Sequence, residues 1–168
     1  MKTRELNRLL LKTAFSVMAC DGDIDQSEID AIKTAGEKER TFGELNLSNE
    51  LNEMRKQINS LGHKFFQNYF TEIENSKLSK DEELKLIEVA IDTINADQKV
   101  QYSEIKFFKI IRNSLDISNE EILKVMPEIE EFLEDDIISE SYIAKLKTGY
   151  FDSVELPEFE EIDFNAEN

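Results

Sequence analysis

The stretch MACDGDIDQSEIDAI, residues 18–32, places five acidic residues and one glycine between two apolar runs. Upstream, apolar residues from Leu6 to Met18 recur at three- and four-residue steps, which is typical of a helix with one buried stripe. Downstream, Asp25 and Glu28 have the spacing of a capping box, in which Asp25 accepts from the amide of Glu28 and the Glu28 side chain reaches back. The stretch therefore predicts a helix, an acidic loop and a capped second helix.

A second stretch, INADQKVQYSEIKFF at residues 94–108, aligns with the first without a gap at a shift of 76 positions. Four of the fifteen aligned pairs are identical, namely Asp21 with Asp97, Ser27 with Ser103, Glu28 with Glu104 and Ile29 with Ile105, and upstream of the stretches Leu10 matches Leu86 and Ala14 matches Ala90. One helix-loop-helix unit cannot bury both of its apolar faces alone, whereas two packed units can. We therefore predict two repeats related by a pseudo-twofold axis, with their acidic loops close together.

The rest of the chain also carries helical periodicity. Helices are expected at residues 48–73, unbroken or divided near Gly62, at 80–95 after a capping box at 79–82, at 102–115, and from Ser118 to a break at Pro127. The helix after the first acidic loop is expected to end at Gly36. The aromatic run over residues 65–70 has the spacing of a buried helix face. With only five glycines and two prolines, the chain is predicted to be an all-α helical bundle.

A length of 168 residues fits one domain and a tail. We place the helical domain at residues 1–150 and an acidic tail at residues 151–168, which we expect to be extended or disordered. The tail alternates acidic residues with apolar ones such as Phe159, Ile162 and Phe164. This pattern fits two alternatives, a solvated end or a short motif that docks on a basic, apolar groove.

Composition limits the partners and the compartment. Asp and Glu outnumber Lys and Arg by 37 to 20, so the formal charge of −17 repels nucleic acid, and no nucleic-acid partner is expected. The stretch before Cys20 resembles a lipobox, but Arg8 and Lys12 leave too short an apolar core for a secretory leader. No run of about 20 apolar residues is present, so no transmembrane helix is expected. These features predict a cytoplasmic protein whose single cysteine forms no internal disulfide.

The first motif, followed by a helix and repeated after an intervening helical hairpin, resembles the TerB-like domain. This domain occurs in bacterial tellurite-resistance proteins and in the amino-terminal part of a membrane-anchored DnaJ-like co-chaperone. The resemblance covers about residues 6–126, and the second copy departs from it where Gln98 replaces the glycine and Lys99 and Gln101 replace acids. It implies about seven helices and an acidic metal-binding centre between the repeats, in proteins tied to membrane stress and chemical defence. The residues that it places in this centre are Asp21, Glu28, Asp97 and Glu104.

The residue chemistry agrees with a hard divalent cation such as calcium, magnesium or manganese, because these ions prefer oxygen ligands. In the first loop Asp23 and Asp25 add to the oxygens of Asp21 and Glu28. We therefore predict a metal site formed by Asp21, Asp23, Glu28, Asp97 and Glu104. The alternative is that these carboxylates only cap helices, which stabilises a helix start by roughly 0.5–2 kcal/mol without any metal.

Other sites fit the sequence less well. An EF-hand that begins at Asp21 would have Gln26 in place of its glycine and Ile32 in place of its bidentate glutamate. Zinc and iron lack ligands, because His63 is the only histidine and Cys20 the only cysteine.

We accordingly expect a protein that is not an enzyme and has no small-molecule substrate. The expected function is that of a binding or scaffold module in a stress-response assembly. Its expected partners are proteins, membrane-associated proteins included. Two alternatives are a hydrolase that uses a carboxylate pair and a structural helical module without a ligand. A carboxylate pair that lines a concave pocket would favour the hydrolase.

Overall fold

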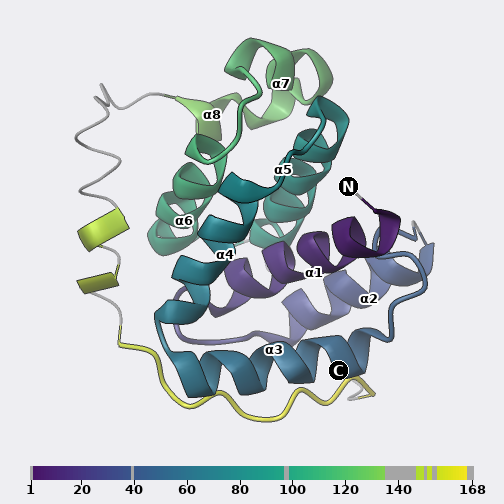
Figure 1. Cartoon of the computed structure of the whole chain (residues 1–168), viewed down its shortest axis with the longest axis vertical. Coiled ribbons are helices and arrows are strands. Elements are labelled where there is room, and N and C mark those ends of the chain that lie inside the picture. Colours follow the sequence, from purple (N-terminus) through teal and green to yellow (C-terminus); the bar gives the residue numbers. More distant parts are fainter. Residues whose placement is uncertain are drawn as a thin grey trace.

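The computed structural model describes residues 2–38, 40–96, 99–134, 147–149, 151–152 and 155–165. Figure 1 labels the helices α1 (Thr3–Ala19), α2 (Gln26–Lys38), α3 (Leu47–Leu61), α4 (Lys64–Asn75), α5 (Lys80–Ile94), α6 (Tyr102–Asn113), α7 (Asn119–Val125) and α8 (Glu130–Leu133). The 3₁₀-helix η1 (Pro127–Ile129) lies between α7 and α8, and residues 147–149 and 151–152 are also helical. No β-strand occurs in the described ranges, which confirms the all-α prediction. Within the same ranges, no helix has both the length and the apolar character needed to cross a membrane.

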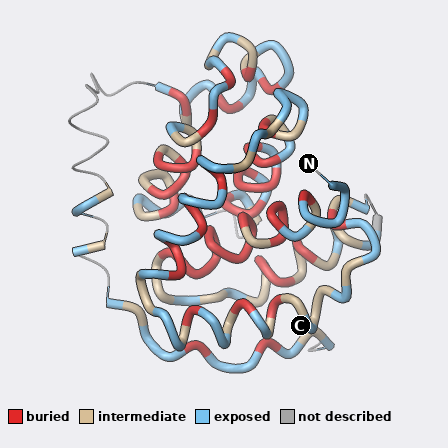
Figure 2. The backbone as a smooth tube through the Cα atoms, in the orientation of Figure 1, coloured by how far each residue is buried: buried red, intermediate tan, exposed pale blue. Residues whose placement is uncertain are grey.

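The two helices that precede the acidic loops, α1 and α5, pack against each other at the centre of the bundle. Around them, α2 packs on α5 and α6 packs on α1, and these two contacts are equivalent when the repeats are exchanged, whereas the α5–α6 contact has no α1–α2 equivalent of similar extent among the described residues. The α1 side chains Leu11, Ala14, Phe15 and Val17 are fully buried in this centre, and Figure 2 shows buried segments concentrated where these helices meet. The packing follows the predicted two-repeat arrangement.

The predicted helix over residues 48–73 is divided into α3 and α4 at Gly62. Gly62 has a φ of 56°, a backbone conformation that glycine adopts without steric cost. The α4 aromatic run is buried as predicted, and its Tyr69 hydroxyl donates a 2.9 Å hydrogen bond to the Thr13 hydroxyl on α1. This contact joins the α3–α4 hairpin to the centre of the bundle.

The expected end of α2 at Gly36 is wrong, because α2 continues to Lys38. A Cβ atom at Gly36 would lie 2.6 Å from Leu47 Cδ1, so the glycine lets the start of α3 pack closely on α2. The helix α6 ends at Asn113 instead of residue 115, while α7 ends at Val125, shortly before Pro127 as expected.

Residues 155–165 of the acidic tail have no regular secondary structure and run extended along α3 (Figure 1). Phe159 and Ile162 are each only 6% exposed and belong to the hydrophobic core. At the start of this segment, Pro157 Cδ lies 3.2 Å from the position of a Cβ on Gly22, in the first acidic loop. The tail segment is therefore packed on the helical domain.

Candidate metal centre

The first acidic loop connects α1 to α2 and is held together by its own carboxylates. Asp21 Oδ1 accepts a 3.0 Å hydrogen bond from the backbone N–H of Asp23, and Asp23 Oδ1 accepts one of 3.0 Å from the N–H of Ile24. Asp21 is partly buried and Asp23 is exposed. Both predicted ligands thus have a structural use in shaping the loop.

The start of α2 carries the predicted capping box in a modified form. The Glu28 carboxylate reaches back as expected, because its Oε2 accepts a 2.9 Å hydrogen bond from the N–H of Asp25. Asp25, however, accepts from the backbone and the hydroxyl of Ser27, at 2.7 and 2.5 Å, where the amide of Glu28 was expected. These two hydrogen bonds from Ser27 lower the pKa of Asp25, and the charge of Lys99 lowers it further.

The second repeat reproduces the reaching-back carboxylate. Glu104 Oε2 accepts a 2.6 Å hydrogen bond from the N–H of Gln101, which occupies the position equivalent to Asp25. Glu28 and Glu104 are both buried, with exposed fractions of 7% and 5%. The remaining predicted ligand, Asp97, lies outside the described residues.

The electrostatics show that the two repeats bring their carboxylates together. The pKa of Glu28 is raised to about 8, first because burial penalises its charged form, and then because of the negative charges of Glu104, Asp21 and Asp25. The hydrogen bond from the Asp25 N–H offsets part of this rise. A buried carboxylate with acidic neighbours from both repeats is therefore a point where a cation would be stabilised.

Cys20, the last residue before the acidic loop, is fully buried beside the same carboxylates. The pKa of its thiol is raised well above the usual range, mainly by burial and then by the charges of Asp21, Glu104 and Glu28. Burial and negative surroundings keep this thiol protonated and so make it a poor metal ligand at neutral pH. The donor set that remains consists of carboxylate oxygens, which fits a hard cation better than zinc.

Part of the predicted site is assembled and part is not. Asp21, Glu28 and Glu104 lie close enough to influence the same buried region electrostatically. Yet within the described ranges no group of three or more His, Cys, Asp and Glu side chains is arranged to hold a metal ion. The carboxylates instead bind backbone amides, which is the geometry of the capping alternative.

Two contributors to this region, Lys99 and Cys20, were not predicted from the sequence. Lys99 was noted only as a replacement for an acid, yet its charge influences Asp25 across the two loops. Nothing in the sequence around Cys20 indicates that the thiol is buried beside acids. The repeat alignment carries a signal for Lys99. It makes residue 99 equivalent to residue 23 and so places Lys99 in the second loop, which is predicted to lie close to the loop of Asp25.

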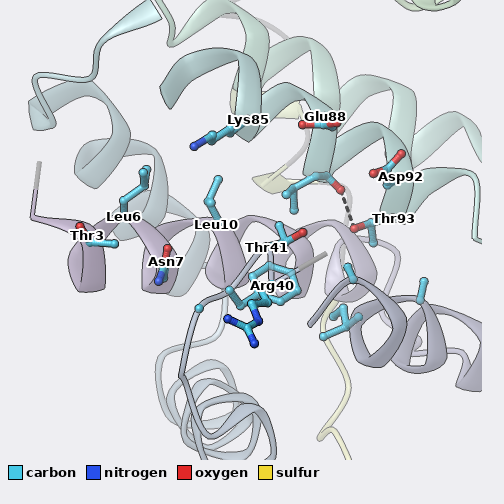
Figure 3. A pocket seen from close by; sticks show the side chains of 16 residues that line it. Thr3, Leu6, Asn7, Leu10, Arg40, Thr41, Lys85, Glu88, Asp92 and Thr93 are labelled. Carbon is cyan, nitrogen blue, oxygen red and sulfur yellow. Dashed lines mark hydrogen bonds between the residues drawn. The ribbon is translucent and has the colours of Figure 1, made fainter. Parts of the chain in front are cut away.

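A separate cavity of about 470 Å³ lies between α1, α5 and the loop around Arg40 (Figure 3). Leu6, Leu10, Ile32, Phe42 and Val89 supply apolar lining, and the polar lining includes Asn7, Arg40, Lys85, Glu88 and Asp92. Of the predicted metal-site residues that the structure describes, Asp21, Asp23, Glu28 and Glu104, none lines it. This cavity is therefore distinct from the acidic centre.

Comparison with protein families gives one result that bears on identity. The model of the family described as tellurite resistance protein TerB matches residues 8–127 of this chain. The match includes both acidic loops and every helix from α2 to α7, and it nearly coincides with the range expected from the motifs. No curated protein and no solved structure gave a match. Since the matched range is well over half of the chain, the protein belongs to the TerB family.

Proposed function

We propose that this protein is a non-catalytic TerB-like binding module that holds a divalent cation between its two acidic loops. It acts as a scaffold in a bacterial stress-response assembly of the tellurite-resistance type. In this proposal it works in the cytoplasm and docks protein partners, membrane-associated ones included. Membership of the TerB family supports the general role.

The observation that carries the cation proposal is the buried carboxylate of Glu28. Its pKa of about 8 means that ionisation at neutral pH is opposed by burial and by Glu104 and Asp21. A divalent cation near these groups would reverse the balance, because an opposite charge within a few ångströms favours the ionised form. Cation binding should therefore release a proton from Glu28.

The residues that would hold the cation are Asp21, Glu28 and Glu104, with Asp23 and Asp97 completing the predicted set. Calcium, magnesium and manganese all take oxygen ligands and keep water in sites with few carboxylates. A bound cation would supply charge neutralisation between the repeats, which ties the two loops together. No catalytic step is assigned to it.

Calorimetric titration of the metal-stripped protein with calcium, magnesium, manganese and zinc tests this proposal. We expect one of the first three ions to bind, with a heat that varies with the ionisation enthalpy of the buffer because a proton is released. Glu28→Gln and Asp21→Asn should each weaken binding by at least about tenfold, equivalent to roughly 1.4 kcal/mol.

The matched control is Glu82→Gln, which alters a glutamate with the same backbone contact at the start of α5. Glu82→Gln should leave the titration unchanged. The absence of binding by any of the ions at millimolar concentration would contradict the proposal and leave helix capping as the role of these carboxylates.

A further inference from the structure

The acidic tail is held on α3 by side-chain amides that bind its backbone. Asn59 accepts from the N–H of Phe159 and donates to its carbonyl, both at 2.9 Å. Asn52 forms the same pair of bonds with Ile162, at 3.1 and 3.2 Å. Each asparagine thus satisfies both backbone groups of one residue of an extended chain.

The spacing of the two asparagines matches the spacing of the two residues that they bind. Asn52 and Asn59 are seven residues apart, which is roughly 10.5 Å along a helix. Phe159 and Ile162 are three residues apart, which is roughly 10 Å in an extended chain. An extended segment can therefore pair with both asparagines without strain, and this pairing depends on backbone atoms only.

Side chains of the tail add the preference for a particular kind of segment. Phe159 and Ile162 are buried, whereas Glu158, Glu160 and Glu161 are exposed to solvent. Next to the segment, a cavity of about 490 Å³ is lined jointly by tail residues and by the region from Gly22 to Ile29. The chain is thus bound by two apolar anchors with acidic residues between and around them.

Basic side chains border this segment. Arg55, between the two asparagines on α3, donates through Nη1 to the carbonyl of Phe159 at 3.3 Å. On α2, Lys33 Nζ lies 5.1 Å from the centre of the Phe164 ring. Arg55 Nε is buried and has no hydrogen-bond acceptor in the part of the chain that the structure describes. A buried donor without an acceptor costs stability, so the tail leaves one binding group of this surface unused.

We propose that the tail-binding face of α3, formed by Asn52, Arg55 and Asn59, is a binding site for an extended acidic segment of a protein partner. The segment carries two apolar residues three positions apart, and the chain's own residues 155–165 are an exchangeable internal ligand. A partner segment that presents a carboxylate to Arg55 Nε gains a charge-assisted bond that the tail does not make. The inference specifies the protein partner of the proposed function, but the three α3 residues of its site are not among the predicted metal ligands.

Competition in the unaltered protein provides the first test. The probe is an unlabelled peptide of residues 155–165, added in excess to the full-length chain labelled with ¹⁵N. The peptide should displace the chain's own tail, so the amides of Phe159 and Ile162 should exchange with solvent faster. Unchanged exchange at saturating peptide would overturn the proposal that the tail is exchangeable.

Fluorescence anisotropy with the labelled peptide provides the second test. Phe159→Ala with Ile162→Ala in the full-length chain should loosen the internal tail and strengthen peptide binding relative to the wild type. In that background, Asn52→Ala or Asn59→Ala should weaken binding about tenfold, because each removes a pair of hydrogen bonds. The control Asn75→Ala alters an exposed asparagine that donates to Thr71 of its own helix, and it should change nothing.

A peptide N-methylated at both Phe159 and Ile162 separates backbone recognition from apolar contact, because it keeps the side chains and loses the two donors. It should bind at least about tenfold more weakly than the unmodified peptide. Equal binding of the two peptides would overturn the proposed pairing.

Circular dichroism and a melting curve establish that each variant is folded, and the competition test needs no variant. If the wild type forms dimers and the Phe159→Ala, Ile162→Ala variant does not, the segment bound on α3 comes from a second copy of this chain. That result would overturn the assignment to a different protein partner.

Discussion

Two capping boxes in this protein have the same backbone contact and opposite electrostatics. Glu28 accepts from the N–H of Asp25 at 2.9 Å, and Glu82 accepts from the N–H of Ser79 at 2.7 Å. The pKa of Glu28 is raised to about 8 by burial and neighbouring acids, whereas the pKa of Glu82 is lowered by its backbone hydrogen bond. The motif thus determines the hydrogen bond, and the tertiary environment determines whether the charge is tolerated.

The ionised carboxylate of Glu28 is therefore destabilised in the folded protein, whereas the ionised carboxylate of Glu82 is stabilised. A helix cap needs only an acceptor, which glutamine supplies as well as glutamate. A buried negative charge beside Glu104 adds nothing to that role. This difference makes Glu28 the better candidate for a function beyond capping.

The largest expected effect is on the pH dependence of stability. In the folded protein the pKa of Glu28 is about 8, above the ordinary glutamate value of 4.5. The contribution of Glu28 to the free energy of unfolding is fully present below pH 4.5 and is lost as the pH rises through 8. Between these values the unfolded state has released a proton that the folded state retains. Without divalent cations, the free energy of unfolding should fall by on the order of 3 kcal/mol between pH 5 and pH 9.

Glu28→Gln should remove this fall, and Glu82→Gln should keep it. Urea denaturation at a series of pH values measures the effect. Parallel curves for Glu28→Gln and the wild type would show that the two capping boxes do not differ as described.

A third glutamate, Glu83, sharpens the comparison because it is buried and fully paired. Its two carboxylate oxygens accept from the N–H groups of Asp116 and Ile117, at 3.0 and 2.8 Å. Glu83→Ala should lower the free energy of unfolding by about 2–3 kcal/mol, because two buried amides lose their acceptor. The exposed Glu88 on the same helix is the control, and Glu88→Ala should cost less than about 0.5 kcal/mol.

Glu104 provides a smaller test of the coupling between the repeats. Glu104→Gln keeps an acceptor for the N–H of Gln101 and removes a negative charge near Glu28. The titration midpoint of Glu28, followed by carboxyl ¹³C NMR, should fall by up to about one pH unit. An unmoved midpoint would mean that burial alone raises the pKa of Glu28.

The smallest effect is expected from the caps themselves. Ser79→Ala and Asp25→Ala should each cost about 1 kcal/mol, since each removes a side-chain acceptor at a helix start. Chemical denaturation with and without divalent cation should give the same loss for Ser79→Ala. A loss for Ser79→Ala that depends on the cation would contradict the separation of capping from binding.

The sequence predicted the parts of the molecule that rest on local pattern and repetition. Residues 79–82 form a capping box in the expected register, and Glu28 reaches back as the motif predicted, with Glu104 doing the same at the aligned position. It failed where contacts are long-range. Gly36 continues a helix because of its packing against Leu47, which no local rule encodes.

The binding mode of the tail was also beyond the sequence. Its acidic and apolar alternation left a solvated end and a docking motif open, because the pattern does not say where an extended chain finds hydrogen-bond partners. The signal was present on α3 as two asparagines seven residues apart, with Arg55 between them. Such a stripe is ordinary on a helix surface, and it gains meaning only when residues 159 and 162 are seen beside it.

Gly22 in the first acidic loop lies close to Pro157 in the tail, so the loop and the tail pack directly against each other. Gly22 has a φ of 93°, and even a methyl group there would press on Pro157 at 3.2 Å. A ligand that moved the Gly22 backbone toward the tail would therefore also have to move Pro157. Thermodynamic linkage makes such an effect reciprocal. If a ligand of the loop changes the affinity of the tail for α3 by some factor, a bound tail changes the affinity of the loop for that ligand by the same factor.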